Sequence, residues 1–293
     1  MLLRPMRDSD VAGVERVTAE AFFALDVATH RADVPAPGGM RPAGRAQRWR
    51  RSAAHLLEHD GPGCWVAEDD QGVCGVALSL RREALWGLSS YAVLPRAQGS
   101  GVGKALLDAA LRYSEGCLRG MICSSHDPRA ARRYRLAGFV LHPAMHVRGT
   151  VARSVLPVVD GIREGGSGDA ALCDSVDRRL RGAGHGVDHA LLLQEFPLEI
   201  CDLMTGSGYC YARPDGSPVL LAATNRRIAQ RLLWSALARS SPDTALEFGD
   251  ITAEQQWAID VALAAGLSVH NEGYLCLRHM RPPAPYLPSG HFL

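Results

Sequence analysis

The sequence predicts an α/β protein of two tandem domains that share one layout. The strongest observation is the stretch Leu88–Tyr113, where an apolar, β-prone segment runs into a turn with three glycines and then into apolar residues at helical spacing. The length is a second observation, because 293 residues suggest two domains of ordinary size. The third is a weaker repeat of the same strand and helix order in the second half. We therefore expect strands and helices to alternate through both halves.

Local patterns place the elements of the first half. Apolar residues at helical spacing mark the helices, and short apolar runs between turn residues mark the strands. Asp69-Asp70-Gln71-Gly72 indicates a hairpin turn, and Asp127-Pro128 indicates a capped helix start. The expected elements are a strand at Leu2–Pro5, a helix over 11–25, a loop at Val34–Gly44, a helix at Arg45–Glu58, strands at Cys64–Glu68, Val73–Leu80 and Leu85–Leu94, a helix over 102–113, a strand at 120–124 and a helix over 128–137.

Composition and charge exclude several classes of protein. Hydrophobic content of 47% and charged content of 22% are typical of a soluble globular chain, and no apolar run reaches membrane-spanning length. The N-terminal residues lack the apolar core of a signal peptide, so we expect a cytoplasmic protein with no membrane partner. Eight cysteines without a Cys-x-x-Cys pair predict free thiols. Residues 1–150 carry a net charge of +5 and residues 151–293 a net charge of −4, which is too small an imbalance to indicate nucleic-acid binding.

The glycine turn predicts an anion site. The N–H groups in the first turn of a helix lack intrahelical partners, and glycines let a phosphate approach them closely. The spacing excludes a P-loop, because Gln98 occupies the position of its first glycine and Ala105 that of its Ser or Thr. The glycines at 99, 101 and 103 also exclude the Gly-x-Gly-x-x-Gly fingerprint of dinucleotide-binding folds.

Two motifs, in order, resemble the GNAT superfamily of N-acetyltransferases. Residues 93–103 read Val-Leu-Pro-Arg-Ala-Gln-Gly-Ser-Gly-Val-Gly and resemble its motif A, Val-x-Pro-x-x-Arg/Gln-x-x-Gly-x-Gly/Ala. Residues 127–139 resemble its motif B, Asn-x-x-Ala-x-x-x-Tyr-x-x-x-Gly-Phe, with Asp127 in place of the usual asparagine. The resemblance covers residues 1–150. It implies a twisted mixed sheet flanked by helices, and we expect this fold in both tandem domains.

The resemblance also implies acetyl-CoA as the cosubstrate and assigns roles to residues. Backbone groups of Tyr91, Ala92 and Val93 would bind pantetheine and the thioester, with the Val93 N–H as the oxyanion donor. Tyr134 matches the general acid that protonates the departing thiolate, and a phenol suits this task because it is protonated at neutral pH. The residues implied to contact acetyl-CoA are Tyr91, Ala92, Val93, Gln98, Gly99, Ser100, Gly101, Val102, Gly103, Lys104, Asp127 and Tyr134.

The general base is left open. Some relatives carry a carboxylate on the substrate-side strand, but this chain has none near Gly87. Glu83, His55 and His126 are weaker candidates, each better explained as a surface or packing residue. Alternatively, water relays the proton from an amine that is already partly neutral.

The second half predicts a diverged copy without the anion turn. We place a catalytic domain at 1–150 and a degenerate domain of the same fold at 151–293. The corresponding turn, Thr224-Asn225-Arg226-Arg227, has no glycine, so Thr224 or Asn225 is expected to cap the helix that follows. The helix over 257–265 offers no phenol in the place of Tyr134. The proline-rich stretch 281–288 is expected to be extended, either docked as an arm or loose.

Two histidine patterns suggest a metal site only weakly. Pro143 and strand-like neighbours argue against a helix that would align His142 with His146. A polar glycine-rich loop explains the stretch 184–189, Gly-His-Gly-Val-Asp-His, better than metal binding does. We therefore expect no metal.

The chain is predicted to be an acetyl-CoA-dependent N-acetyltransferase that moves an acetyl group to a primary amine by direct attack on the thioester. The acceptor, a small molecule or a peptide, and the oligomeric state are left open. One alternative is a non-catalytic acyl-CoA-binding sensor or scaffold, which the missing base favours. Another is a tandem synthase of the mycothiol type, in which the second domain performs the transfer; the absence of a glycine turn there disfavours it.

Overall fold

The computed structural model describes residues 1–30 and 38–293 and contains two compact units. The first unit comprises residues 1–81 and 86–117, and the second comprises residues 82–85 and 118–293. The expected loop at Val34–Gly44 lies partly outside the described residues. Sheets flanked by helices make up both units, which confirms the predicted α/β class.

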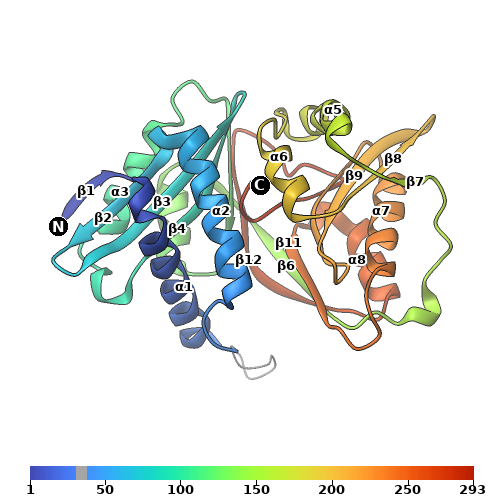
Figure 1. Ribbon diagram of the computed structural model, residues 1–293, viewed down its shortest axis with the longest axis horizontal. Coiled ribbons are helices and arrows are strands. Elements are labelled where there is room, and N and C mark those ends of the chain that lie inside the picture. Colours follow the sequence, from blue (N-terminus) through green and yellow to red (C-terminus); the bar gives the residue numbers. More distant parts are fainter. Residues whose placement is uncertain (31–37) are drawn as a thin grey trace. The chain divides into compact units, whose positions relative to one another are not determined.

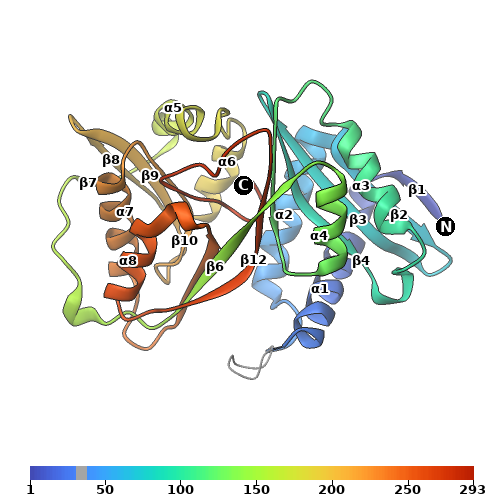
Figure 2. The ribbon, with the colours of Figure 1, turned by 180° about the vertical axis from the view of Figure 1, so that it is seen from behind.

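The first unit is a sheet with strand order β1-β2-β3-β4. Helices α1 and α2 lie on one face of this sheet and α3 lies on the other, as the two opposite views show (Figure 1, Figure 2). A Cβ atom on Gly75 of β3 would lie 2.8 Å from a methyl group of Leu106, so this glycine lets α3 pack closely on the sheet. The elements are β1 (Leu2–Pro5), α1 (Val11–Ala28), α2 (Ala43–Asp60), β2 (Cys64–Asp69), β3 (Gly72–Arg82), β4 (Leu85–Val93) and α3 (Val102–Arg112).

The second unit contains two groups of paired strands, in the orders β5-β12-β6-β11 and β13-β10-β9-β8-β7. Its elements are β5 (Arg119–Ser124), α4 (Pro128–Leu136), β6 (Val140–Gly149), β7 (Ile162–Glu164), α5 (Ala170–Arg181), α6 (Asp188–Glu195), β8 (Leu198–Leu203), β9 (Gly206–Ala212), β10 (Pro218–Ala223), α7 (Arg226–Ala238), β11 (Leu246–Ile251), α8 (Gln256–Ala264), β12 (Ser268–Arg278) and β13 (Tyr286–Leu287).

Strand β12 lies between β5 and β6, which precede it by more than a hundred residues. It pairs antiparallel with both, so that Leu275 faces Cys123 on one side and His142 on the other. In turn, β6 pairs with β11 as well as with β12. These pairings draw residues 118–150 into the second unit. The compact units therefore do not coincide with the predicted domains 1–150 and 151–293, and the assignment of a catalytic and a degenerate domain stays a prediction.

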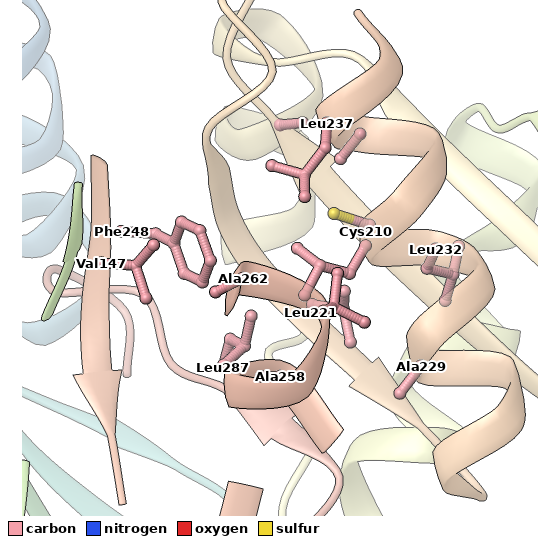
Figure 3. Packing of buried hydrophobic residues seen from close by; sticks show 14 of the residues in the cluster. Val147, Cys210, Leu221, Ala229, Leu232, Leu237, Phe248, Ala258, Ala262 and Leu287 are labelled. Atoms are coloured by element: carbon pink, nitrogen blue, oxygen red, sulfur yellow. The ribbon is translucent and has the colours of Figure 1, made fainter. Parts of the chain in front are cut away.

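The core of the second unit lies between α7, α8 and the strands (Figure 3). Leu232 and Leu237 of α7 are fully buried there, and each such side chain contributes roughly 1.5–3 kcal/mol through burial. Consecutive residues of β9 are buried, so both faces of this strand are covered. Cys210 belongs to the core shared with α7, whereas the hydroxyl of Tyr209 donates to Asp177 of α5 on the other face.

The proline-rich stretch docks on the second unit. Strand β13 pairs with β10, placing Leu287 opposite Leu221, and both the Tyr286 ring and Leu293 are buried. Docking, rather than a loose end, is therefore the observed outcome. Among the described residues, no helix is long and apolar enough to cross a membrane.

Candidate acetyl-CoA site

The junction between β4 and α3 has the conformation that an anion site requires. Gly99 has φ +80° and Gly101 has φ +89°, both in the left-handed region that favours glycine. No heavy atom lies within 4 Å of a Cβ built on either glycine, so the space above the turn is open. Gly101 occupies the N-cap position of α3. Because it has no side chain, it cannot accept a hydrogen bond from the first N–H groups of the helix.

The first turn of α3 leaves N–H groups available. The N–H of Ala105 donates to the carbonyl of Gly101 at 3.1 Å, which is the first bond of the helix. Within the described part of the chain, the N–H groups of Val102, Gly103 and Lys104 have no acceptor. Such groups, together with the positive end of the helix dipole, bind phosphate. The turn thus fits the pyrophosphate of CoA.

Side chains of the turn fix its shape. The amide of Gln98 donates to the carbonyl of Val93 at 2.9 Å, and the hydroxyl of Ser100 donates to the carbonyl of Ala97 at 2.7 Å. Gln98 therefore ties the turn to the end of β4 through its side chain. Lys104 is exposed and forms an ion pair with Asp108 at 2.8 Å, one helical turn further on. An exposed pair of this kind contributes little to stability, so Lys104 can exchange Asp108 for a phosphate.

The backbone hydrogen bond at the end of β4 fixes the direction of the Val93 peptide groups. The N–H of Leu94 donates to the carbonyl of Cys74 in β3 at 2.8 Å. Successive backbone groups of a strand point in opposite directions, so the N–H and the carbonyl of Val93 point away from β3. The side-chain amide of Gln98 donates a hydrogen bond to that carbonyl. This geometry supports the predicted use of the Val93 N–H, and Tyr91 and Ala92 precede it on the same strand.

The motif B residues belong to the second unit, where Asp127 precedes α4 as its N-cap and Tyr134 lies on that helix. Asp127 caps α4 by accepting from the N–H of Arg129 at 2.8 Å, as expected. Burial by itself would raise the pKa of Asp127, but hydrogen bonds from the side chain and backbone of Arg129 outweigh it and lower the pKa. The ring of Tyr134 is 4% exposed, and its carbonyl accepts from the N–H of Phe139 at 3.0 Å where the helix ends. Tyr134 is therefore buried, and its backbone is fixed where α4 ends.

Of the candidate bases named from the sequence, Glu83 is engaged elsewhere, since it forms an ion pair with Arg178 at 2.7 Å. The structure instead shows a titratable group that sequence reasoning missed, Asp250 of β11. Burial raises its pKa to about 6, while a hydrogen bond with Cys123 of β5 opposes the shift. No local pattern predicts this contact, because it joins strands that are far apart in the sequence.

A histidine pair lies on neighbouring strands of the same unit. His146 of β6 stacks on His270 of β12 with ring centroids 5.5 Å apart, and His270 contacts Glu272 at 3.2 Å. Burial lowers the pKa of His146, although Glu272 opposes the shift. Residues 140–149 form a strand, so His142 and His146 share no helix face, in agreement with the argument against a helix there.

The corresponding junction between β10 and α7 is closed. The side chain of Asn225 accepts from the N–H of Ile228 at 3.1 Å and donates to the carbonyl of Thr205 at 2.9 Å. The hydroxyl of Thr224 accepts from the N–H of Ser207 at 3.0 Å. The prediction that Asn225 or Thr224 caps this helix is confirmed for Asn225.

Comparisons with known proteins support one family. Residues 27–139 match the acetyltransferase (GNAT) family. The chain is similar in structure to a protein from Pyrococcus horikoshii assigned as an acetyltransferase, with a TM-score of 0.75 at 14% identity. The match covers 99% of this chain and 95% of that protein. It is also similar to a GCN5-related N-acetyltransferase from Kribbella flavida, with a TM-score of 0.58 at 19% identity over 94% of this chain and 71% of that one. A GCN5-related N-acetyltransferase from Sphaerobacter thermophilus is similar with a TM-score of 0.58 at 14% identity over 96% of each chain. No curated protein matches the chain. The structural likenesses establish the fold, and the part of the chain that matches the acetyltransferase (GNAT) family contains both the glycine turn and α4.

Proposed function

We propose that the protein is an N-acetyltransferase that uses acetyl-CoA as donor and a primary amine as acceptor. The GNAT family match indicates acyl transfer from an acyl-CoA. The observation that carries the proposal is the uncapped first turn of α3, with two left-handed glycines and open space above them. An anionic cosubstrate is the ligand that such a turn binds.

The residues of this chain have separate tasks in the proposal. N–H groups of 102–104 hold the pyrophosphate, and the exposed Lys104 adds a positive charge. Acetyl-CoA supplies an activated acyl group as a thioester, whose carbonyl carbon the amine attacks. The Val93 N–H donates to the thioester oxygen as negative charge develops on it. As the C–S bond breaks, Tyr134 gives its phenolic proton to the departing sulfur, and water carries the proton that the amine loses back to the phenolate.

The pyrophosphate site and the oxyanion donor are held in one arrangement before the cosubstrate binds. The Gln98 side chain keeps the end of β4 and the glycine turn in one arrangement, so the pyrophosphate site and the oxyanion donor are fixed together. Fixing two groups in advance removes part of the entropy cost of reaching the transition state. We expect the acceptor to be a small molecule or a peptide.

An acceptor screen tests the proposal. Wild-type protein and acetyl-CoA are incubated with separate pools of small amines and of peptides, and thiol release is measured against protein-free blanks. Amine-dependent thiol release that requires Gly101 supports the enzyme. Tight acetyl-CoA binding without thiol release from any pool would favour the sensor, and absence of binding would contradict both.

A further inference from the structure

A buried polar cluster lies in the second unit, outside the proposed acetyl-CoA site. It contains Asp177 of α5, His185 and His189, which are at most 2% exposed, and one donor atom from each lies within 4.8 Å of the other two. The sequence predicts a polar loop at 184–189. That expectation is wrong for its end, because α6 begins at Asp188 and both histidines are buried.

The inner atoms of the cluster are spaced as metal ligands are. His185 Nδ1 lies 2.7 Å from Asp177 Oδ2, and His189 Nε2 lies 3.9 Å from the same oxygen. Asp174, one turn before Asp177 on α5, brings its Oδ1 to 3.3 Å from His189 Nε2. Ligand atoms about 2.0–2.1 Å from a tetrahedral zinc ion lie roughly 3.3 Å from one another. The ligand atoms of Asp177, His185 and His189 therefore already lie close together, and Asp174, which now contacts only His189 of these residues, completes the set by turning its side chain.

The outer nitrogen of each histidine has its own oxygen partner. His185 Nε2 lies 2.9 Å from the backbone oxygen of Leu293, and His189 Nδ1 lies 3.1 Å from the hydroxyl of Tyr211. Metal-binding histidines characteristically donate their other ring N–H to an oxygen, which fixes the ring and directs the free nitrogen at the metal. Both carboxylates are held as well, since the Tyr209 hydroxyl donates to Asp177 at 2.6 Å and the Gly186 N–H donates to Asp174 at 2.9 Å.

His189 Nε2 is the observation that points to a ligand. This atom is buried and makes no hydrogen bond within the described part of the chain, although oxygens of Asp174 and Asp177 face it. With its proton on Nδ1 toward Tyr211, the ring would direct a lone pair at two carboxylates. That arrangement is repulsive unless a cation lies between them.

The charges around the cluster are arranged for a cation. Two carboxylates face its centre, whereas the buried guanidinium of Arg181 lies behind His185, 2.9 Å from its outer nitrogen. Arg181 also contacts the Tyr286 hydroxyl and the backbone oxygen of Leu293 on that outer side. The positive charge is thus held on the outer side by the Tyr286 hydroxyl and the Leu293 oxygen, outside the space between the ligands.

We propose that Asp174, Asp177, His185 and His189 bind one divalent transition metal ion of the zinc class. Two imidazoles and two carboxylates suit zinc, and a set of four protein ligands is typical of a structural site. The ion joins α5 to the start of α6 and stabilises the second unit. The proposal is independent of acetyl-CoA binding.

Metal binding by the full-length protein tests the proposal. Chelator-treated protein is titrated with Zn²⁺ in competition with a chromophoric chelator, and separately with Co²⁺. We expect about one equivalent of Zn²⁺ per chain, visible Co²⁺ absorption of tetrahedral intensity, and a Tm that rises with Zn²⁺ because the ion binds the folded state. Failure of Zn²⁺ to bind or to raise the Tm, or a Co²⁺ spectrum unchanged from aqueous ion, would overturn it.

Variants then assign the ligands. Asp174→Asn and His189→Gln should weaken Zn²⁺ binding about 100-fold or more, because each removes one of four ligands. His59→Gln, an exposed histidine on α2, should bind Zn²⁺ as the wild type does. Asp174 is the most exposed of the four, so its variant is expected to fold, which circular dichroism checks. Wild-type affinity in a folded Asp174→Asn protein would contradict the four-ligand site.

Discussion

Two strand–helix junctions of this chain have the same layout and opposite properties. Between β4 and α3, left-handed glycines leave the first turn of the helix open. Between β10 and α7, Asn225 and Thr224 fill the corresponding space with their own side chains. A helix N-terminus therefore becomes a binding site or an internal joint according to whether the preceding turn lacks or carries capping side chains.

Gly101→Glu is the variant that should most sharply separate the two junctions. It forces a side chain into the left-handed region, at a cost of roughly 1–2 kcal/mol, and places a carboxylate where the pyrophosphate would bind. Loss of two charge-assisted hydrogen bonds at about 1.5–3 kcal/mol each should weaken acetyl-CoA binding by roughly 100-fold or more in calorimetry.

Gly116→Glu is the matched control, because Gly116 has φ +80° and lies beyond the other end of α3, where a Cβ atom would meet only Arg81, at 3.6 Å. This variant carries similar strain and the same added charge. Equal losses of affinity in the two variants would mean that the turn at 98–104 does not hold the cosubstrate.

Tyr134→Phe should lower turnover by about 100-fold and leave acetyl-CoA affinity nearly unchanged, because it removes only the proposed proton donor. Steady-state kinetics with any accepted amine measures the first effect and calorimetry the second. Tyr113→Phe is the control: it removes a hydroxyl that donates to Asp60 at 3.1 Å and should retain wild-type turnover. Full activity of Tyr134→Phe would assign the proton to water or to another group.

Asn225→Ala should affect stability and not binding. Loss of the N-cap of α7 should lower the free energy of unfolding by about 1 kcal/mol, measured in denaturant. Native mass spectrometry should still find about one acetyl-CoA per chain, since the β10–α7 junction is not expected to hold a second pyrophosphate. Two equivalent sites in the wild type, or lost binding in this variant, would show that the second junction also takes the cosubstrate.

Asp250→Asn should produce the smallest change, a difference in pH dependence. Because burial raises the folded-state pKa to about 6, the protonated carboxyl stabilises the fold at low pH, and this contribution is lost as the pH rises through that value. The Tm of the wild type should therefore fall relative to that of the variant as the pH is raised from 4.5 to 7. Parallel Tm profiles would indicate an ordinary pKa for Asp250.

Sequence reasoning succeeded where structure is local. The β4 turn, the cap at Asp127 and the cap at Asn225 all depend on residues within a few positions of one another, and all are confirmed. It failed where structure depends on distant pairing. Nothing in the apolar pattern of β12 distinguishes a strand that pairs with its own half from one that lies between β5 and β6.

The buried cluster around Asp177 shows the same limit in side chains. Its glycine-rich segment has the composition of an exposed loop, and only the packing of α5, β9 and the Leu293 region encloses the histidines. Composition predicts the local backbone there but does not predict that both histidines are buried beside Asp177.

The position of β12 sets an order of events during synthesis. Strands β5 and β6 leave the ribosome with the gap between them unfilled, and the segment that fills it, residues 268–278, follows more than a hundred residues later. At ordinary elongation rates this delay is on the order of ten seconds, during which both strands expose unpaired edges. A nascent chain stalled before residue 268 should thus recruit chaperones through those edges, and release of the stall should end that dependence.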